Sequence, residues 1–253
     1  MAKTIAVVNQ KGGVGKSTTA VNLGACLAEL DNQVLLIDID PQGNATSGVG
    51  VDKSSLDYCV YDILVEDEDI LDVIVNTQVE NLDLIPATID LAGAEVELVS
   101  LFSRELRLKK RLKEIKDYYD YILIDCPPSL GLLTLNALTA SDVVLVPIQC
   151  EYYALEGLGQ LMRTIQLVQK QLNPKLEIDG VVLTMYDART NLAQQVIDEV
   201  KNHFQDRVYE TIIPRNVRLS EAPSFGQPIC KYDASSRGAK AYSSLAREVM
   251  SNG

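Results

Sequence analysis

The stretch Lys11-Gly12-Gly13-Val14-Gly15-Lys16-Ser17-Thr18 decides how this chain of 253 residues folds. An apolar run at residues 5–8 precedes it, and a helical pattern at 19–30 follows it. A strand, a glycine-rich loop, a lysine, a hydroxyl residue and a helix in this order are typical of a phosphate-binding loop. The glycines let several backbone N–H groups point at one anion, and the following helix adds the positive end of its dipole.

The loop departs from the usual pattern, G-x-x-x-x-G-K-[ST], at two positions. Gln10 takes the place of the first glycine, and Lys11 adds a second lysine. Lys16 is expected to reach the β- and γ-phosphates of a nucleotide, and the Ser17 hydroxyl is expected to hold Mg²⁺. The pattern therefore predicts a nucleoside triphosphate site with one lysine more than the usual loop needs.

Apolar runs that end in an acid or a turn alternate with helical patterns along the chain. Strands are expected at residues 5–8, 34–38, 82–86, 121–125, 143–147, 178–185 and 208–213. Helices are expected at 19–30, 58–75, 92–99, 103–117 with Ser103 as N-cap, 130–140, 153–172, 191–204 and 237–250. The glycines and proline of 41–50 predict a loop. The alternation predicts an α/β fold, a doubly wound and mostly parallel sheet flanked by helices, and without a repeat or linker we expect one domain, 1–253.

The composition fits a globular protein, since 47% of the residues are hydrophobic. No run of about 18 apolar residues occurs, so no transmembrane helix is expected. Residues 1–4 lead directly into the first strand, so we expect no signal peptide and a cytoplasmic protein. The five cysteines are scattered without a C-x-x-C pair, which indicates reduced thiols rather than a metal cluster.

The net charge of −12 taken alone argues against nucleic acid as a partner. Residues 51–100 contain thirteen acidic residues and one basic residue, and this block accounts for the whole imbalance. We interpret the acidic block as a solvated surface rather than a docking site. The rest of the chain is neutral in sum, so a basic patch elsewhere on the surface remains compatible with the sequence.

Three acids follow strands next to the glycine loop. Asp125 ends the strand at 121–125, where a carboxylate can hold Mg²⁺ as the Walker B acid does. Asp38 and Asp40 stand on alternate residues after a second strand, so both can face the γ-phosphate. One of the two could orient the attacking water while the other supports the metal shell. The alternative interpretation is an aspartate that caps a turn.

These motifs together resemble the deviant Walker ATPases of the ParA/MinD family, in particular the chromosome-partitioning ParA/Soj group. Lys11 is the residue that separates this family from other proteins with a phosphate-binding loop. The resemblance covers nearly the whole chain and is carried by five stretches in order, residues 11–18, 38–44, 124–131, 146–157 and 213–224.

The resemblance implies roles for single residues. Proteins of this kind bind ATP with Mg²⁺ in a sandwich homodimer, in which the signature lysine, here Lys11, reaches the phosphates of the opposite subunit. It implies that Asp40 positions the hydrolytic water and that Asp38 lies near the metal. Glu151 resembles the family's ribose contact. Pro214 and Asn216 resemble the loop that holds adenine.

The resemblance also implies that the ATP-bound dimer binds duplex DNA without sequence preference and is released when a ParB-type centromere-binding protein stimulates slow hydrolysis. Such binding needs clustered lysines and arginines. The preferred candidates are Arg189, Arg215 and Arg218, with Lys201 and Arg207 in the same region, and Arg215 and Arg218 share a face if they are helical. The basic run at 104–116 is denser, but its leucines predict a core helix with a solvated face. The implied location is the nucleoid.

Three alternatives differ in what they require. A MinD-like septum-positioning ATPase ends in a basic amphipathic helix that inserts into membranes, whereas the helix at 237–250 has few bases and is expected to pack on the domain. An iron–sulfur reductase like the nitrogenase iron protein needs cysteines that bridge a cluster, and no such spacing is evident. A nucleotide-binding scaffold without turnover is disfavoured by Lys11, Lys16, Asp40 and Asp125 together.

Overall fold

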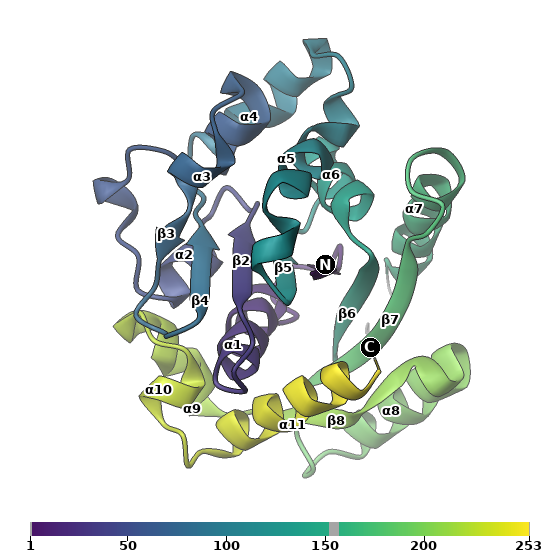
Figure 1. Cartoon of the computed structure of the whole chain (residues 1–253). Coiled ribbons are helices and arrows are strands. Elements are labelled where there is room, and N and C mark those ends of the chain that lie inside the picture. The colour runs from purple at the N-terminus through teal and green to yellow at the C-terminus, as the bar shows by residue number, and fades with distance from the viewer. Residues whose placement is uncertain (1, 152–156, 253) are drawn as a thin grey trace.

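One sheet of eight strands forms the centre of the protein in a computed structural model that describes residues 2–151 and 157–252 (Figure 1). The strand order is β3-β4-β2-β5-β1-β6-β7-β8. Every pair is parallel except β3 with β4. The strands are β1 (Lys3–Val7), β2 (Val34–Asp38), β3 (Val75–Asn76), β4 (Leu82–Ile85), β5 (Tyr121–Asp125), β6 (Val143–Gln149), β7 (Glu177–Tyr186) and β8 (Val208–Pro214). The predicted fold class is confirmed.

Helices cover both faces of this sheet, and each face has its own apolar core. One core includes residues of α1, α2, α10 and α11, which lie together in the lower part of Figure 1. The other includes residues of α4 to α8. The helices are α1 (Lys16–Ala28), α2 (Asn44–Gly48), α3 (Ile70–Val73), α4 (Leu91–Glu97), α5 (Arg107–Ile115), α6 (Leu132–Ala140), α7 (Leu158–Gln171), α8 (Asn191–Phe204), α9 (Val217–Glu221), α10 (Ile229–Tyr232) and α11 (Arg237–Ser251).

Three central strands end side by side at one edge of the sheet. In the parallel register Asp125 at the end of β5 is opposite Val7 of β1 and Asp38 of β2. Strand β2 is buried along its whole length, as expected for a strand with helices on both faces. The register therefore brings the residues that follow β1, β2 and β5 to one place, at the edge where ligands bind in sheets of this kind.

Several predicted elements have the expected bounds or nearly so. The strands at 34–38 and 121–125 and the helix at 191–204 are confirmed to the residue. The strand expected at 143–147 continues to Gln149, and the final helix begins at Arg237 as expected. The helix expected at 153–172 is seen as α7 from Leu158, and residues 153–156 lie outside the described ranges.

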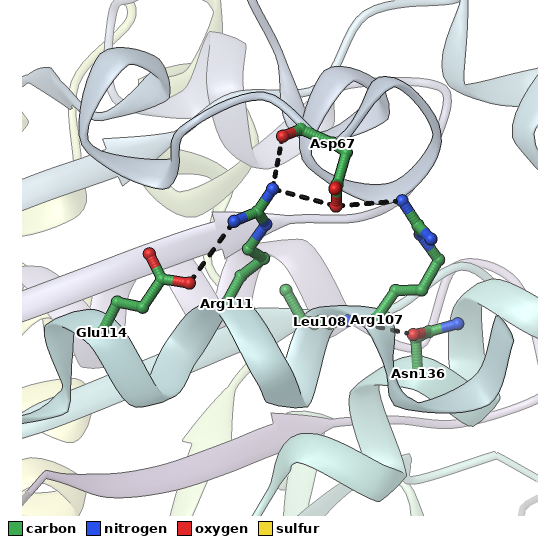
Figure 2. Close-up of polar contacts among 6 residues, drawn as sticks. All are labelled: Asp67, Arg107, Leu108, Arg111, Glu114 and Asn136. Carbon is green, nitrogen blue, oxygen red and sulfur yellow. Dashed lines mark hydrogen bonds and ion pairs between the residues drawn. The ribbon is translucent and has the colours of Figure 1, made fainter. Parts of the chain in front are cut away.

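The helix expected over 58–75 is wrong. The chain forms a single π-type turn at Asp62–Glu66, the short helix α3 and the edge strand β3 instead. The break is at Asp67, which takes a left-handed conformation with φ of 67°. Its carboxylate accepts from Arg107 at 3.2 Å and Arg111 at 2.9 Å, both on α5 (Figure 2). The Arg111 guanidinium also donates to the Asp67 carbonyl, so α5 holds this turn from outside the local sequence.

Two further predictions fail, and for the first of them a partner distant in sequence decides the local structure. Ser103 is not a helix N-cap through its side chain, and α5 begins only at Arg107. The Oδ1 of buried Asn136 on α6 accepts the Leu108 N–H at 3.2 Å and so takes the capping role (Figure 2). The loop expected at 41–50 contains the helix α2. The short helices α9 and α10 were not predicted.

The final helix packs on the domain as expected. Its apolar face is buried, with Tyr242, Leu245, Ala246 and Val249 at most 1% exposed. It contacts α1 and β8, and Figure 1 shows it crossing beside them. No helix within residues 2–151 and 157–252 is both long and apolar enough to cross a bilayer.

Candidate functional site

The glycine loop connects β1 to α1 and is held from both sides. Gly13 and Gly15 adopt positive φ angles of 74° and 88°, which side chains rarely tolerate. Asn9 accepts the Lys11 N–H at 3.0 Å and donates to the Pro147 carbonyl at 2.7 Å. These contacts hold the curved loop at the N-terminus of α1, where backbone N–H groups and the helix dipole favour a bound anion.

Lys16 lies beneath this curl at the first turn of α1. Its ammonium donates to the Lys11 carbonyl at 3.1 Å, and the residue is only 7% exposed. Burial lowers the pKa of Lys16, and the carboxylates of Asp125 and Asp40 oppose that shift. The amine therefore lies among acids that favour its charged form, which is the form that binds phosphate.

A cavity of about 490 Å³ opens beside the loop. Lys16, Ser17, Asp40 and Met185 are among the residues that line it. Predicted nucleotide-binding residues that also line it are Gly12, Gly13, Gly15 and Thr18. Val14 does not line this cavity; it is buried, and its carbonyl accepts the Thr184 hydroxyl at 2.8 Å. Lys11 is partly exposed and does not line this cavity.

Asp38 anchors the loop that carries Asp40. The N–H and the hydroxyl of Thr46 both donate to Asp38 Oδ2 at 2.8 Å, and the Asp40 N–H donates to Oδ1 at 3.1 Å. Burial raises the pKa of Asp38 to about 6, against the lowering effect of these hydrogen bonds. Because both oxygens already accept hydrogen bonds, this geometry favours a positioning role for Asp38 over direct metal binding.

Asp125 is the opposite case. It is fully buried, and neither of its carboxylate oxygens has a hydrogen-bond partner within the described ranges. Burial raises its pKa well above the usual value, and the charge of Asp38 adds to the shift, while Ser17 and Lys16 nearby act in the other direction. A buried carboxylate without partners next to a hydroxyl and a phosphate loop fits Mg²⁺, whose preferred ligands are oxygens.

A second cavity, of about 530 Å³, adjoins the first. Pro214 and Asn216, predicted to hold adenine, line it together with Gly15, Thr18 and Met185. The Asn216 side chain accepts the Arg218 N–H at 2.9 Å and caps α9. Gly15, Thr18 and Met185 line both cavities, so the two lie next to each other along the loop.

Glu151 is not brought to either cavity. It is exposed, and its carboxylate accepts from the Gln149 side chain at 2.7 Å. The residues that follow it, 152–156, lie outside the described ranges. They belong to the stretch 146–157, which is one of the five that carry the family resemblance. Its role as a ribose contact stays a prediction.

The three arginines predicted to bind DNA lie near the carboxyl ends of β7 and β8. All three are exposed, and two are paired with acids: Arg189 with Asp187 at 2.6 Å and Arg218 with Glu221 at 2.9 Å. Arg215 makes no ion pair within the part of the chain that is described. Arg215 precedes α9 and is not helical, so the condition under which it would share a helical face with Arg218 is not met.

The rival basic run on α5 is partly engaged inside the protein. Arg107 and Arg111 bind Asp67, and Arg111 also binds Glu114 at 3.4 Å (Figure 2). Lys110 and Lys113 are exposed. This helix therefore presents lysines to solvent while its arginines fasten the acidic turn at 62–67.

Some residues of the site had no signal in the sequence analysis. Thr46 binds Asp38 and also accepts the Ala87 N–H at 3.0 Å, so it ties β2, α2 and the end of β4 together. Lys53 donates to the carbonyls of Gln42 and Gly43. An isolated threonine or lysine has no recognisable pattern, although Asn9, two residues before Lys11, fits the local turn that Asn side chains often form.

Comparisons with known proteins agree with this geometry. A family model described as an AAA domain matches residues 2–178. The chain is 68% identical to the sporulation initiation inhibitor protein Soj of Bacillus subtilis, over 100% of both chains. It is 54% identical to the chromosome partitioning protein ParA of Myxococcus xanthus, over 99% of this chain and 88% of the relative.

A solved structure with the same fold contains nucleotide. Cobyrinic acid a,c-diamide synthase from Mycobacterium smegmatis, with a bound ATP analog and magnesium, matches with a TM-score of 0.86 and 41% identity. The match covers 98% of this chain and 93% of that chain.

The Asp38 anchor predicts a large loss of stability for Thr46→Val. This change keeps the shape but removes one hydrogen bond to a carboxylate and leaves the Ala87 N–H unpaired, so the free energy of unfolding should fall by about 2–4 kcal/mol. Urea unfolding measures it.

Thr139→Val is the matched control. Thr139 is equally buried, but its hydroxyl has no partner within the described residues, so the same change should cost less than about 1 kcal/mol. Equal losses in the two variants would contradict the anchoring role.

Proposed function

Because the chain belongs to the ParA/MinD family, in its Soj/ParA branch, we propose that it is a chromosome-partitioning ATPase that hydrolyses ATP to ADP and phosphate. The observation that carries the proposal is the arrangement around the first cavity. Lys16 and Asp40 line this cavity. Asp125 is buried close to Lys16 at the end of the adjacent strand β5, and its carboxylate has no hydrogen-bond partner among the described residues. The similarity to Soj over the full length of both chains supports chromosome partitioning as the process in which this site acts.

The loop and Lys16 bind the phosphates in this proposal. Backbone N–H groups of the loop and the N-terminus of α1 face the anion, and the Lys16 ammonium reaches the β- and γ-phosphates. Ser17 and Asp125 would hold Mg²⁺, which would supply positive charge next to the phosphates. Pro214 and Asn216 of the adjoining cavity contact the base.

Asp40 orients the attacking water. It lines the cavity, and its backbone is fixed by the Asp38 carboxylate. A residue that positions water must be held within a fraction of an ångström, so the buried anchor formed by Asp38 and Thr46 supports this role. Asp38 itself then acts through Asp40, with the metal-supporting role as the secondary possibility.

Lys11 acts on the partner subunit. Its side chain is partly exposed and lines neither cavity of its own subunit, whereas Lys16 is buried under the same loop. A second ammonium delivered across a dimer stabilises charge on the transferred phosphoryl group, as an arginine finger does. The catalytic set of Lys11, Lys16 and Asp40 is then complete only in a homodimer, and ATP binding and dimerisation become one linked equilibrium.

The ATP-bound dimer binds duplex DNA on the nucleoid without sequence preference. Arg189, Arg215 and Arg218 are exposed on one region of the surface, and dimerisation doubles the charge they present. DNA phosphates must compete with Asp187 for Arg189 and with Glu221 for Arg218. Each single contact is therefore weak, and binding depends on several contacts acting together. A ParB-type centromere-binding protein stimulates the slow hydrolysis and releases the dimer.

A MinD-like membrane function is the alternative. It requires a terminal helix with a free apolar face, but that face of α11 is buried against the domain within the described residues. Binding to anionic lipid vesicles and to duplex DNA, each measured with ATP, separates the two functions. The proposal expects binding to DNA alone.

The two lysines of the loop should fail in different ways. Lys16→Ala should weaken ATP binding by about a hundredfold or more, because the buried ammonium that binds the phosphates is removed. Lys11→Ala should bind ATP as a monomer with little change but should not dimerise. Titration with a fluorescent ATP analogue and sedimentation velocity measure both effects. A Lys11→Ala protein that dimerises normally with ATP would exclude the role across the dimer.

Charge reversal tests the DNA surface. Arg189→Glu and Arg218→Glu should keep the ATP-dependent dimer but lower DNA affinity, and the slope of log K against log salt should fall by about one for each phosphate that the protein no longer binds. Lys113→Glu on α5 is the matched control and should change neither quantity. Unchanged affinity in both arginine variants, with weaker binding in Lys113→Glu, would move the DNA surface to α5.

A further inference from the structure

Two thiols that the proposed function does not use meet between α1 and α10. Cys26 on α1 and Cys230 on α10 are 2% and 9% exposed. Both border a cavity of about 360 Å³ whose rim includes the exposed side chains of Glu29 and Lys240. The cavity therefore opens to solvent beside the two cysteines.

Contacts on both sides hold the two cysteines opposite each other. Asn22, Cys26 and Glu29 lie four and three residues apart, so they share one face of α1. The Asn22 Oδ1 accepts the Ile229 N–H at 2.6 Å, and Lys231 Nζ pairs with Glu29 Oε1 at 3.0 Å. Cys230 is the residue between these two partners, just as Cys26 lies between Asn22 and Glu29 on α1.

Cys230 is the more exposed of the two thiols, and it is next to Lys231 in the chain. The Cys26 thiol, and more weakly Lys231, lower the pKa of Cys230, whereas burial and the charge of Glu29 oppose that shift. The pKa values of the remaining cysteines, Cys59, Cys126 and Cys150, are raised by burial. A low pKa next to a second thiol is typical of cysteines that react with disulfides.

We propose that Cys26 and Cys230 are a redox-active pair that forms a reversible intramolecular disulfide with low-molecular-weight disulfides. The Cys230 thiolate attacks one sulfur of the reagent and releases the first thiolate. Cys26 then loses its proton, attacks the Cys230 sulfur of the mixed disulfide and releases the second thiol. The two cysteines lose two protons and two electrons, and the reagent is reduced to two thiols.

The bond would act on the wall of the nucleotide cavity. Helix α1 begins at Lys16 in the glycine loop, and Ala222, Pro223 and Gln227, which precede α10, line the main cavity. A covalent link from Cys26 to Cys230 fastens the segment 222–232 to α1. Local opening of this segment is then restricted, so oxidation slows the exchange of nucleotide. The bond itself does not depend on the proposed function, whereas its effect on exchange does.

The test uses the full-length protein with oxidised glutathione. The number of free thiols, titrated after denaturation, should fall from five to three, and peptide mapping should find residues 26 and 230 linked. Dithiothreitol should restore five. Dissociation of a fluorescent ADP analogue should slow by about threefold or more in the oxidised protein, since opening is blocked.

Three variants complete the test. Cys26→Ser and Cys230→Ser should form no intramolecular bond and should release the analogue at the same rate with or without oxidant. Cys150→Ser, the matched control, should still lose two thiols. Five unreacted thiols, or a disulfide between another pair of cysteines, would overturn the proposed pair. This outcome does not depend on whether ATP is the ligand of the protein. If the disulfide forms but the fluorescent ADP analogue dissociates at an unchanged rate, the proposed effect of the disulfide on nucleotide exchange would be overturned.

Discussion

Two buried carboxylates at the same level of adjacent strands set the conditions for the rest of this structure. Asp38 on β2 and Asp125 on β5 are register partners, both fully buried, and burial raises the pKa of each. Buried charges persist only if hydrogen bonds or opposite charges offset their desolvation. The segment that follows β2 supplies Asp38 with three hydrogen bonds. Asp125 has no hydrogen-bond partner among the described residues, and Ser17 and Lys16 nearby favour its charged form.

This asymmetry connects the fold to the proposed chemistry. The hydrogen bonds that satisfy Asp38 also fix Asp40 and Thr46, so a buried charge holds a cavity-lining acid in position. The unsatisfied carboxylate of Asp125 is the oxygen ligand that a phosphate-bound cation would need. In the proposed function the same edge of the sheet therefore binds the nucleotide, holds the metal and positions water, and only the contribution of Lys11 must come from a second subunit.

Local patterns predicted the elements whose structure depends on local sequence. Buried strands such as 34–38 and the glycine loop were read correctly, because their periodicity and backbone conformation follow from nearby residues. The break at Asp67 depends on the arginines of α5, about 40 positions away, so the apolar pattern of 58–75 wrongly predicts one continuous helix. The start of α5 at Arg107 depends on Asn136, about 30 positions away. In the site, the motifs indicated Lys16, Asp40 and Asp125, but Thr46, Thr184 and Met185 belong to no motif and become visible only when the sheet brings them together.

The central claim is that ATP occupancy and assembly are one equilibrium, with Asp40 needed for hydrolysis and not for binding. Sedimentation velocity of Asp40→Ala, with ATP, with ADP and without nucleotide, tests it most directly. The account predicts a stable dimer with ATP, because hydrolysis no longer returns the protein to the ADP form, and a monomer in the other two states. A monomer in all three states, or hydrolysis at the unaltered rate, would contradict it.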